Sequence, residues 1–181
     1  MGAQERFAIV GGLAVSARTV PRFTADLDIA VAVESDAAAE AVVFRLSNAG
    51  FRPEVILERA DHSQLATARL RQTTKTPLID LLFATCGIER EVVDAAEVLT
   101  VLGHDLHVAR TGHLIAMKLL SRDDNRRPMD RQDLVHLVEI ADSEEWDRAE
   151  TAVRLIEHRG FARNRDLRAA LATWRTDGAD A

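Results

Sequence analysis

One segment of the chain limits the choice of fold more than any other. Leu78–Ala84 (LIDLLFA) is apolar on both faces of an extended chain, apart from Asp80. Strands with two apolar faces lie in the interior of a sheet, where both faces are covered, so we expect a central strand here. Burying an ionised carboxylate without a partner costs several kcal/mol. Asp80 therefore needs a metal, a base or an exposed strand end.

The residues up to about 110 predict short strands around one clear helix. Ser35 is a typical N-cap for this helix, which we expect over Asp36–Asn48. A shorter helix over Leu13–Ala17 follows a glycine pair. The expected strands are short apolar or alternating runs: Phe7–Val10, Leu27–Val33, Phe51–Leu57, Leu65–Leu70, Leu78–Ala84 and a hairpin over Val98–Val108.

The rest of the chain predicts helices joined by polar turns. Apolar residues recur at helical spacing over residues 111–121, 129–140, 143–159 and 164–174. Thr111 and Ser143 are placed to act as N-caps. Together these elements predict an α+β fold. It would consist of a mixed sheet with flanking helices in residues 1–110 and a helical C-terminal region, residues 111–181, packed on that core.

Composition excludes several classes of protein. The 181 residues carry a formal net charge of −6 and are 47% hydrophobic, which suits a folded domain and not a protein that coats nucleic acid. A single cysteine, Cys86, excludes a disulfide scaffold and a cysteine-based zinc site and fits a reducing compartment. No apolar run approaches the roughly 18 residues of a membrane helix. We therefore expect a cytoplasmic protein without a membrane partner.

The carboxylates on the expected strands point to metal chemistry. Asp26 and Asp28 are two residues apart on one strand, so their side chains project from the same face. Two such carboxylates repel each other unless a cation lies between them, and hard oxygen ligands suit Mg²⁺ or Mn²⁺. If the strand of Asp80 lies beside this one, three carboxylates converge on one spot. Such a group can hold two cations for in-line displacement at phosphorus.

Other residues are suited to binding phosphate. The pair Gly11-Gly12 leads from a strand into a helix, where backbone N–H groups can approach a triphosphate. Ser16 and Arg22 lie close enough in sequence to supply further donors. Lys118 is one of only two lysines among the 23 basic residues, and it lies among apolar neighbours on a predicted helix. As a point charge it would reach the β- or γ-phosphate.

Each feature also has an ordinary structural explanation. A glycine pair after a strand is often a simple turn. The Asp26–Asp28 pair would equally suit a solvated strand edge, and Lys118 a surface position with its apolar stem packed on the helix. Their order and spacing along one chain favour the functional interpretation.

The sequence resembles the DNA polymerase β-like nucleotidyltransferase superfamily. Residues 11–31 (GGLAVSARTVPRFTADLDIAV) combine its glycine pair, short helix and Asp-x-Asp strand. The form Arg-x-Thr-x-Asp-x-Asp, with Arg22, Thr24, Asp26 and Asp28, is similar to AbiEii/AbiGii-type nucleotidyltransferases, the toxins of two-gene toxin–antitoxin and phage-defence systems. Residues 111–137 (TGHLIAMKLLSRDDNRRPMDRQDLVHL) resemble the later motifs of that group: a helical lysine, an arginine-rich loop and an acidic helix.

The resemblance assigns roles to individual residues. Asp26 and Asp28 would be metal ligands and Asp80 the third, catalytic carboxylate. Lys118 would bind phosphate, and either Asp130 or Asp133 would be the acidic residue of the last motif. The nucleotide-binding residues would be Gly11, Gly12, Ser16, Arg22, Thr24, Lys118, Asp130 and Asp133.

We therefore expect a metal-dependent transfer of a nucleoside monophosphate from an NTP to an acceptor hydroxyl. The resemblance implies a toxin that acts on RNA such as tRNA and has a cognate antitoxin, and the late arginines favour a phosphate-rich acceptor. One alternative is a nucleotidyltransferase for a small aminoglycoside-like molecule, a polycation that needs an acidic cleft. Another is a non-catalytic binding or antitoxin-like member, although such a protein need not keep all of its carboxylates.

Overall fold

The computed structural model describes residues 6–59, 64–123 and 128–178. Within these ranges a mixed sheet of seven strands has the order β3-β4-β5-β2-β1-β7-β6. The pairs β2–β5 and β1–β7 are parallel, and the other neighbours are antiparallel. The strands are β1 (Arg6–Val10), β2 (Asp26–Ala32), β3 (Arg52–Arg59), β4 (Gln64–Arg71), β5 (Leu78–Leu82), β6 (Glu97–Val101) and β7 (His104–Val108).

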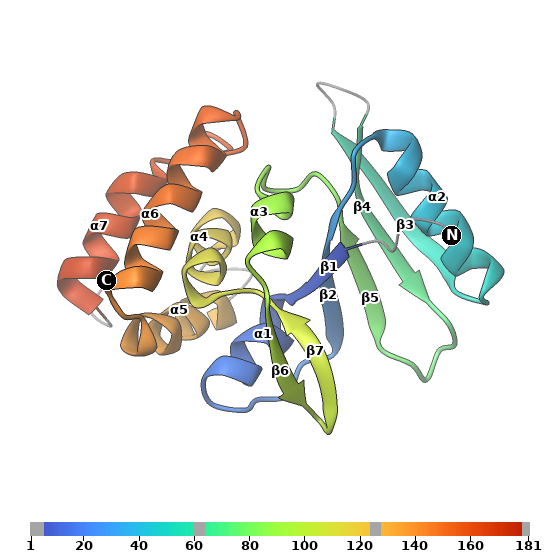
Figure 1. The fold of residues 1–181 in the computed structure, drawn as a ribbon, viewed down its shortest axis with the longest axis horizontal. Helices are drawn as coiled ribbons and strands as arrows, with labels where there is room; N and C mark the ends of the chain where they lie inside the picture. The colour runs from blue at the N-terminus through green and yellow to red at the C-terminus, as the bar shows by residue number, and fades with distance from the viewer. Residues whose placement is uncertain (1–5, 60–63, 124–127, 179–181) are drawn as a thin grey trace.

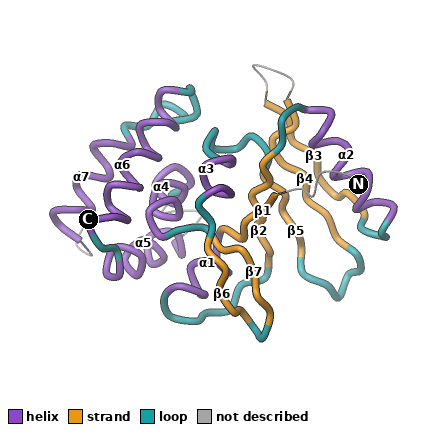
Figure 2. Tube along the Cα trace, in the orientation of Figure 1, coloured by secondary structure: helices purple, strands orange, loops and turns teal. Residues whose placement is uncertain are grey.

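The expected central strand is confirmed, since β5 lies inside the sheet between β4 and β2. Helices cover both sides of the sheet, with α2 on one side and α4–α7 on the other (Figures 1 and 2). No helix in the described ranges is long and apolar enough to cross a lipid bilayer. The helices are α1 (Gly11–Arg18), α2 (Asp36–Asn48), α3 (Glu89–Asp94), α4 (Thr111–Ser121), α5 (Pro128–Ile140), α6 (Ser143–His158) and α7 (Leu167–Asp177).

Two hydrophobic clusters form on opposite faces of the sheet. Ala30 belongs to the larger cluster and Val31 to the smaller, because successive strand residues point to opposite faces. The larger cluster joins Val10 of β1 to Leu114 of α4 and Leu134 of α5. The sheet and the C-terminal helices therefore share one core, and α4 begins at Thr111, where the helical region was predicted to start.

Two of the predicted N-caps are wrong. Thr111 and Ser143 are the first residues of α4 and α6, not their caps. The Asp142 side chain caps α6 by accepting the Glu145 N–H at 2.9 Å. Glu145 in turn accepts the Gly112 N–H at the start of α4, at 2.7 Å. An acidic side chain from a neighbouring helix thus replaces the local threonine, because α4 and α6 pack together.

The other helix ends show which local signals are reliable. The Ser35 hydroxyl accepts the Ala38 N–H at 3.2 Å, so the predicted cap of α2 is confirmed. The last helix begins at Leu167 and not at Asn164, because Asn164 has a left-handed backbone (φ 61°) that cannot continue a helix. The short helix α3 was not predicted; it has six residues, fewer than the periodicity test needs.

Candidate functional site

The sheet register brings together strand carboxylates that are far apart in the sequence. In the parallel pair β2–β5, Asp28 lies opposite Asp80, and Asp26 lies opposite Leu78. Asp26 and Asp28 share a face with Ala30, which packs into the larger cluster. These carboxylates therefore lie on the face that α4 covers. The strand of Asp80 thus lies beside that of Asp26, as the three-carboxylate hypothesis required.

The glycine pair wraps closely around this strand motif. Gly11 has φ 62°, and a Cβ built on it would lie 1.9 Å from Oδ2 of Asp28. A Cβ on Gly12 would lie 2.9 Å from Nη2 of Arg22 and 3.0 Å from Oγ1 of Thr24. Only glycine permits both the left-handed backbone and the close contact with Asp28. The glycine pair at the start of α1 thus packs directly against the segment from Arg22 to Asp28.

Arg69 is a site residue that the sequence did not reveal. It lies opposite Asp80 in the β4–β5 pair and donates from Nε to Oδ1 at 2.7 Å and from Nη2 to Oδ2 at 2.6 Å. The hydrogen bond to Asp80, and the charges of Asp80, Asp26 and Asp28, raise the pKa of Arg69 above its usual value against the effect of burial. The alternation in β4 marks Arg69 as polar, but only the register shows its partner.

The carboxylates fit a divalent ion held by two protein ligands. Among the described residues, no group of three His, Cys, Asp or Glu side chains is arranged to hold a metal. Both oxygens of the buried Asp80 are bound by Arg69. Asp26 and Asp28 are two further hard oxygen donors, and they share one face of β2. Mg²⁺ in nucleotide sites commonly takes one or two carboxylates and completes its coordination with phosphate oxygens and water.

Lys118 lies in a group of charges, here called the Lys118 cluster, that also contains the partly buried Arg22 and the buried Asp130 and Asp133. Lys118 Nζ is 2.7 Å from Oδ1 of Asp130 and 2.8 Å from Oδ2 of Asp133. Arg22 donates to both oxygens of Asp133, from Nε at 2.8 Å and from Nη2 at 2.7 Å. Both acids of the last motif therefore orient the basic groups. The formal charges of the four side chains sum to zero.

A cavity of about 330 Å³ between the sheet and α4 joins the predicted residues. Gly11, Asp28, Asp80 and Lys118 all line it, and so does Arg69. They come from the β1–α1 turn and from β2, β5, α4 and β4. β4, β5 and α4 lie outside the motif of residues 11–31, so their convergence with it is a property of the fold.

A second cavity of about 730 Å³ opens beside Asp26 and has a mostly apolar lining. Ser16, Arg22 and Thr24 also line it. The Ser16 hydroxyl accepts the Arg22 N–H at 3.3 Å, so it fixes the loop before β2. Asp26 and Asp28 thus open onto different cavities. The arginine-rich loop after α4 falls partly on residues 124–127, outside the described residues.

Comparisons with known proteins agree with this architecture. No protein-family model and no curated protein sequence matches the chain. The crystal structure of an antigenic nucleotidyltransferase-like protein from Paracoccidioides brasiliensis is similar, with a TM-score of 0.50 and 19% identity. The alignment covers 93% of this chain and 84% of that one. This chain has a nucleotidyltransferase-like fold.

Two other solved structures are similar at lower TM-scores. The antibiotic-resistance factor ANT(2'')-Ia has a TM-score of 0.45 and 19% identity, over 93% of this chain and 83% of that one. The nucleotidyltransferase toxin MenT4 from Mycobacterium tuberculosis has a TM-score of 0.36 and 16% identity, over 97% and 87%.

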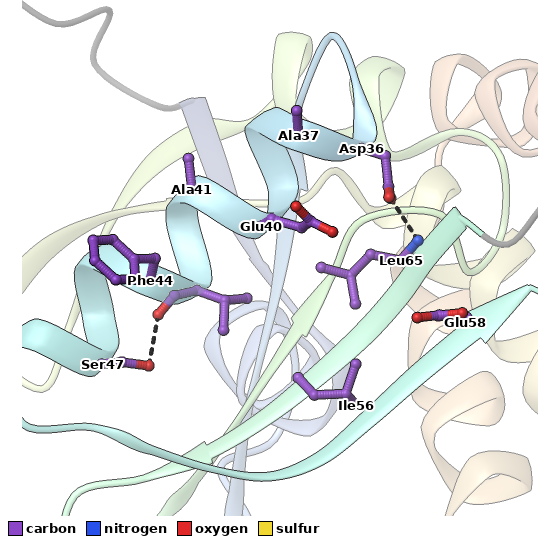
Figure 3. A pocket seen from close by; sticks show the side chains of 10 residues that line it. Asp36, Ala37, Glu40, Ala41, Phe44, Ser47, Ile56, Glu58 and Leu65 are labelled. Carbon is purple, nitrogen blue, oxygen red and sulfur yellow. Dashed lines mark hydrogen bonds between the residues drawn. The ribbon is translucent and has the colours of Figure 1, made fainter.

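A further groove of this nucleotidyltransferase-like fold lies on the opposite face, between α2 and β3 (Figure 3). It encloses about 620 Å³, and its apolar lining includes Phe44 and Ile56. The Asp36 carboxylate also lines this groove, but it accepts a hydrogen bond from the Leu65 N–H at 2.6 Å and so stabilises the start of β4. None of the predicted site residues lines this groove. The candidate site is therefore the pair of cavities around Asp26 and Asp28.

Proposed function

We propose that the protein is a metal-dependent nucleotidyltransferase. The observation that carries this proposal is the cavity in which Gly11, Asp28, Asp80 and Lys118 meet. A close backbone turn, neighbouring carboxylates and a lysine are the groups that a nucleoside triphosphate and its cation need. The fold is that of nucleotidyltransferase-like proteins, and Gly11, Asp28 and Lys118 belong to the motifs that carry the sequence resemblance.

In this proposal Asp26 and Asp28 hold Mg²⁺ or Mn²⁺. The ion would neutralise charge on the triphosphate and polarise the phosphorus that is attacked. Backbone N–H groups at the start of α1, beside Gly11 and Gly12, would bind the phosphates, since the helix dipole favours negative charge there. Lys118 would exchange its carboxylate partners for a phosphate oxygen. Rates would then depend on positioning and on neutralising charge, as in phosphoryl transfer generally.

The transfer step has a simple balance. The acceptor hydroxyl oxygen forms a bond to the α-phosphorus, and the bond from that phosphorus to the bridging oxygen of the β-phosphate breaks. Pyrophosphate leaves with the bonding electron pair. The hydroxyl proton would pass to one oxygen of Asp80, which lies opposite Asp28 in the sheet register, once the hydrogen bonds from Arg69 have opened.

We further propose that the acceptor is RNA, with tRNA as the specific candidate. Arg163 supports this choice, because it is exposed and lies at the lining of the carboxylate cavity. Its backbone is left-handed (φ 54°), an uncommon conformation for a residue other than glycine. A guanidinium there would bind a phosphate and repel a polycationic acceptor. The motif resemblance adds a toxin role and a cognate antitoxin, and the single cysteine favours a cytoplasmic location.

Labelled NTPs and total RNA test the transfer directly. We expect the protein to label RNA in the presence of Mg²⁺ or Mn²⁺, and we expect Asp26→Ala to reduce labelling by at least about 100-fold. Asp105→Ala, an exposed carboxylate change on β7, is the matched control and should leave labelling unchanged. Circular dichroism establishes that each variant is folded. Full labelling by Asp26→Ala would exclude the mechanism, and labelling of an aminoglycoside instead of RNA would exclude the acceptor.

The toxin role needs a cellular assay. Expression in a bacterial host should arrest growth, and coexpression of the neighbouring gene should relieve the arrest. Asp26→Ala should not arrest growth, since the arrest would depend on nucleotide transfer. Growth arrest by this variant at equal protein level would separate toxicity from transfer and contradict the proposal.

A further inference from the structure

Arg69 binds a group that the proposed reaction needs. Asp80 is 7% exposed, and both of its oxygens accept hydrogen bonds from the Arg69 guanidinium. The side chain of Arg69 is 40% exposed, so the guanidinium reaches the buried carboxylate from the solvent side. A two-point pair of this kind is among the stronger hydrogen-bonded contacts that a carboxylate makes. Before any ligand binds, Arg69 therefore holds both oxygens of Asp80 in place.

The charges around the site explain why a cation is needed there. Asp26, Asp28 and Asp80 together carry three negative charges when ionised, and all three act on Arg69. The Lys118 cluster contributes no net positive charge. Neighbouring carboxylates repel one another unless a cation compensates them. Arg69 partly replaces the cation that a loaded site would contain.

We propose that Arg69 is an internal counter-cation that competes with a divalent metal for Asp80. It deepens the proposed function and rests on it for the identity of the metal and the NTP. A guanidinium keeps its charge at every physiological pH, so loss of its proton does not open the pair, whereas a cation that binds Asp80 does. The released guanidinium then pairs with a phosphate of the incoming NTP, a geometry that its fork of N–H groups matches. Metal and nucleotide consequently bind with positive coupling.

The coupling follows from the two alternatives open to Arg69. Without nucleotide, a metal that takes Asp80 leaves the guanidinium without its partner and close to a dication. With nucleotide, a phosphate oxygen accepts hydrogen bonds from the guanidinium, so Arg69 is no longer left unpaired beside the metal. A bare metal ion therefore binds Asp26 and Asp28 but not Asp80, whereas the metal and the NTP together bind all three carboxylates. Arg69 acts as a positioning residue for Asp80.

Binding of Mn²⁺ to the full chain without nucleotide, followed by electron paramagnetic resonance, tests the competition. Arg69→Met keeps the length of the side chain and removes the charge, so we expect Mn²⁺ to bind about tenfold more tightly. Arg71→Met is the matched control, because Arg71 lies two residues along β4 and pairs with Glu54 at 2.9 Å. That variant should bind Mn²⁺ like the parent protein. Unchanged or weaker binding in Arg69→Met overturns the proposal.

A double-mutant cycle shows whether the effect passes through Asp80. Asp80→Asn should cancel the gain, so that adding Arg69→Met to it leaves Mn²⁺ affinity unchanged. A gain that persists in the double variant contradicts competition for Asp80. The double variant also removes the buried unpaired charge that Arg69→Met leaves, so the question stays open to measurement if the single variant unfolds. In that event Arg69→Lys, which keeps the charge and loses the fork, should still bind Mn²⁺ more tightly than the parent.

The outcomes separate this inference from the proposed function. The Mn²⁺ comparison needs no acceptor and no turnover, so it decides the role of Arg69 even if no RNA is labelled. Where labelling occurs, Arg69→Met should raise the KM for the NTP and weaken the dependence of metal affinity on nucleotide. A loss of labelling with unchanged metal–nucleotide coupling would show a merely structural role.

Discussion

At the scale of single residues, the missing side chain of Gly11 is as important as the carboxylates. Its left-handed backbone brings the main chain against Asp28, in space that any other side chain would fill. The position of Asp28 relative to the start of α1 is therefore fixed from two sides, by the sheet and by this turn. A substitution at Gly11 would change the turn and leave the pairing of the strands in place, so it tests the two constraints separately.

Gly11→Ala should abolish nucleotide transfer while leaving most of the fold intact. The backbone strain costs about 1–3 kcal/mol of unfolding free energy, and the new methyl group displaces the Asp28 carboxylate. Gly103→Ala is a suitable control, because Gly103 also has a positive φ (81°) but no neighbour within 4 Å of its Cβ position. Urea unfolding and RNA labelling give the comparison. Equal labelling by the two variants would show that the contact with Asp28 does not matter.

His113 makes stability depend on pH. Burial, reinforced by the charge of Arg148, lowers the pKa of His113 to about 4. The unfolded chain takes up a proton near pH 6.5 and the folded chain only near pH 4, so stability falls as the pH falls between these values. The loss amounts to about 3 kcal/mol over the whole interval. Urea midpoints measured between about pH 7 and pH 4 should show it.

A substitution identifies His113 as the source of this slope. The Nδ1 atom of His113 has no hydrogen-bond partner among the described residues, so an apolar replacement leaves no partner behind. His113→Leu should flatten the pH dependence over this interval. The same slope in this variant would assign it to other groups.

At the scale of elements, the helices α4 and α6 pack closely against each other. A Cβ on Gly112 would lie 2.2 Å from the backbone oxygen of Glu145. The Glu145 side chain accepts the Gly112 N–H, so one residue of α6 both packs against α4 and caps it. Arg110 adds a hydrogen bond to the Glu145 carboxylate at 2.6 Å. These hydrogen bonds thus hold the C-terminal helices at the end of the sheet, and the contact between α4 and α6 leaves no room for a side chain at position 112.

For Gly112→Ala, the sign of the change in the free energy of unfolding shows whether helix propensity or the contact with α6 dominates. Helix propensity alone would stabilise the protein by about 1 kcal/mol, because alanine favours a helix over glycine. The contact with the backbone of Glu145 should reverse this, with a net loss of about 1–3 kcal/mol as α4 and α6 move apart. The urea midpoint measures the change. A higher midpoint in the variant would mean that the junction yields without strain.

The same elements show what sequence reasoning could and could not predict. Hydrophobic periodicity and local caps are properties of neighbouring residues, so strands such as β5 and the Ser35 cap were predicted. Glu145 lies in the first turn of α6, but its partner Gly112 is 33 residues away in the sequence. Likewise, only the register of β4 and β5 shows that Arg69 lies opposite Asp80. Contacts across the sheet and between helices require the fold itself.

At the scale of the whole molecule, a single core predicts cooperative unfolding. The larger hydrophobic cluster contains residues of the sheet and of α4–α7, including the buried Trp174. The only two tryptophans, Trp146 and Trp174, lie in α6 and α7, so fluorescence follows the helical region while far-ultraviolet circular dichroism follows the whole chain. The two urea transitions should coincide. Separate midpoints would show that residues 111–181 unfold as an independent unit.

The scarcity of lysine gives the molecule a built-in chemical reporter. Lys75 is exposed, whereas the ammonium of Lys118, the other lysine, lies between two carboxylates in a side chain that is 12% exposed. Acylating reagents attack accessible, neutral amines. Apart from the terminal amine, they should modify Lys75 readily and Lys118 only when its ion pairs open. The number of acyl groups per chain, measured by mass spectrometry, therefore reports the fraction of molecules in which the ion pairs of Lys118 with Asp130 and Asp133 have opened.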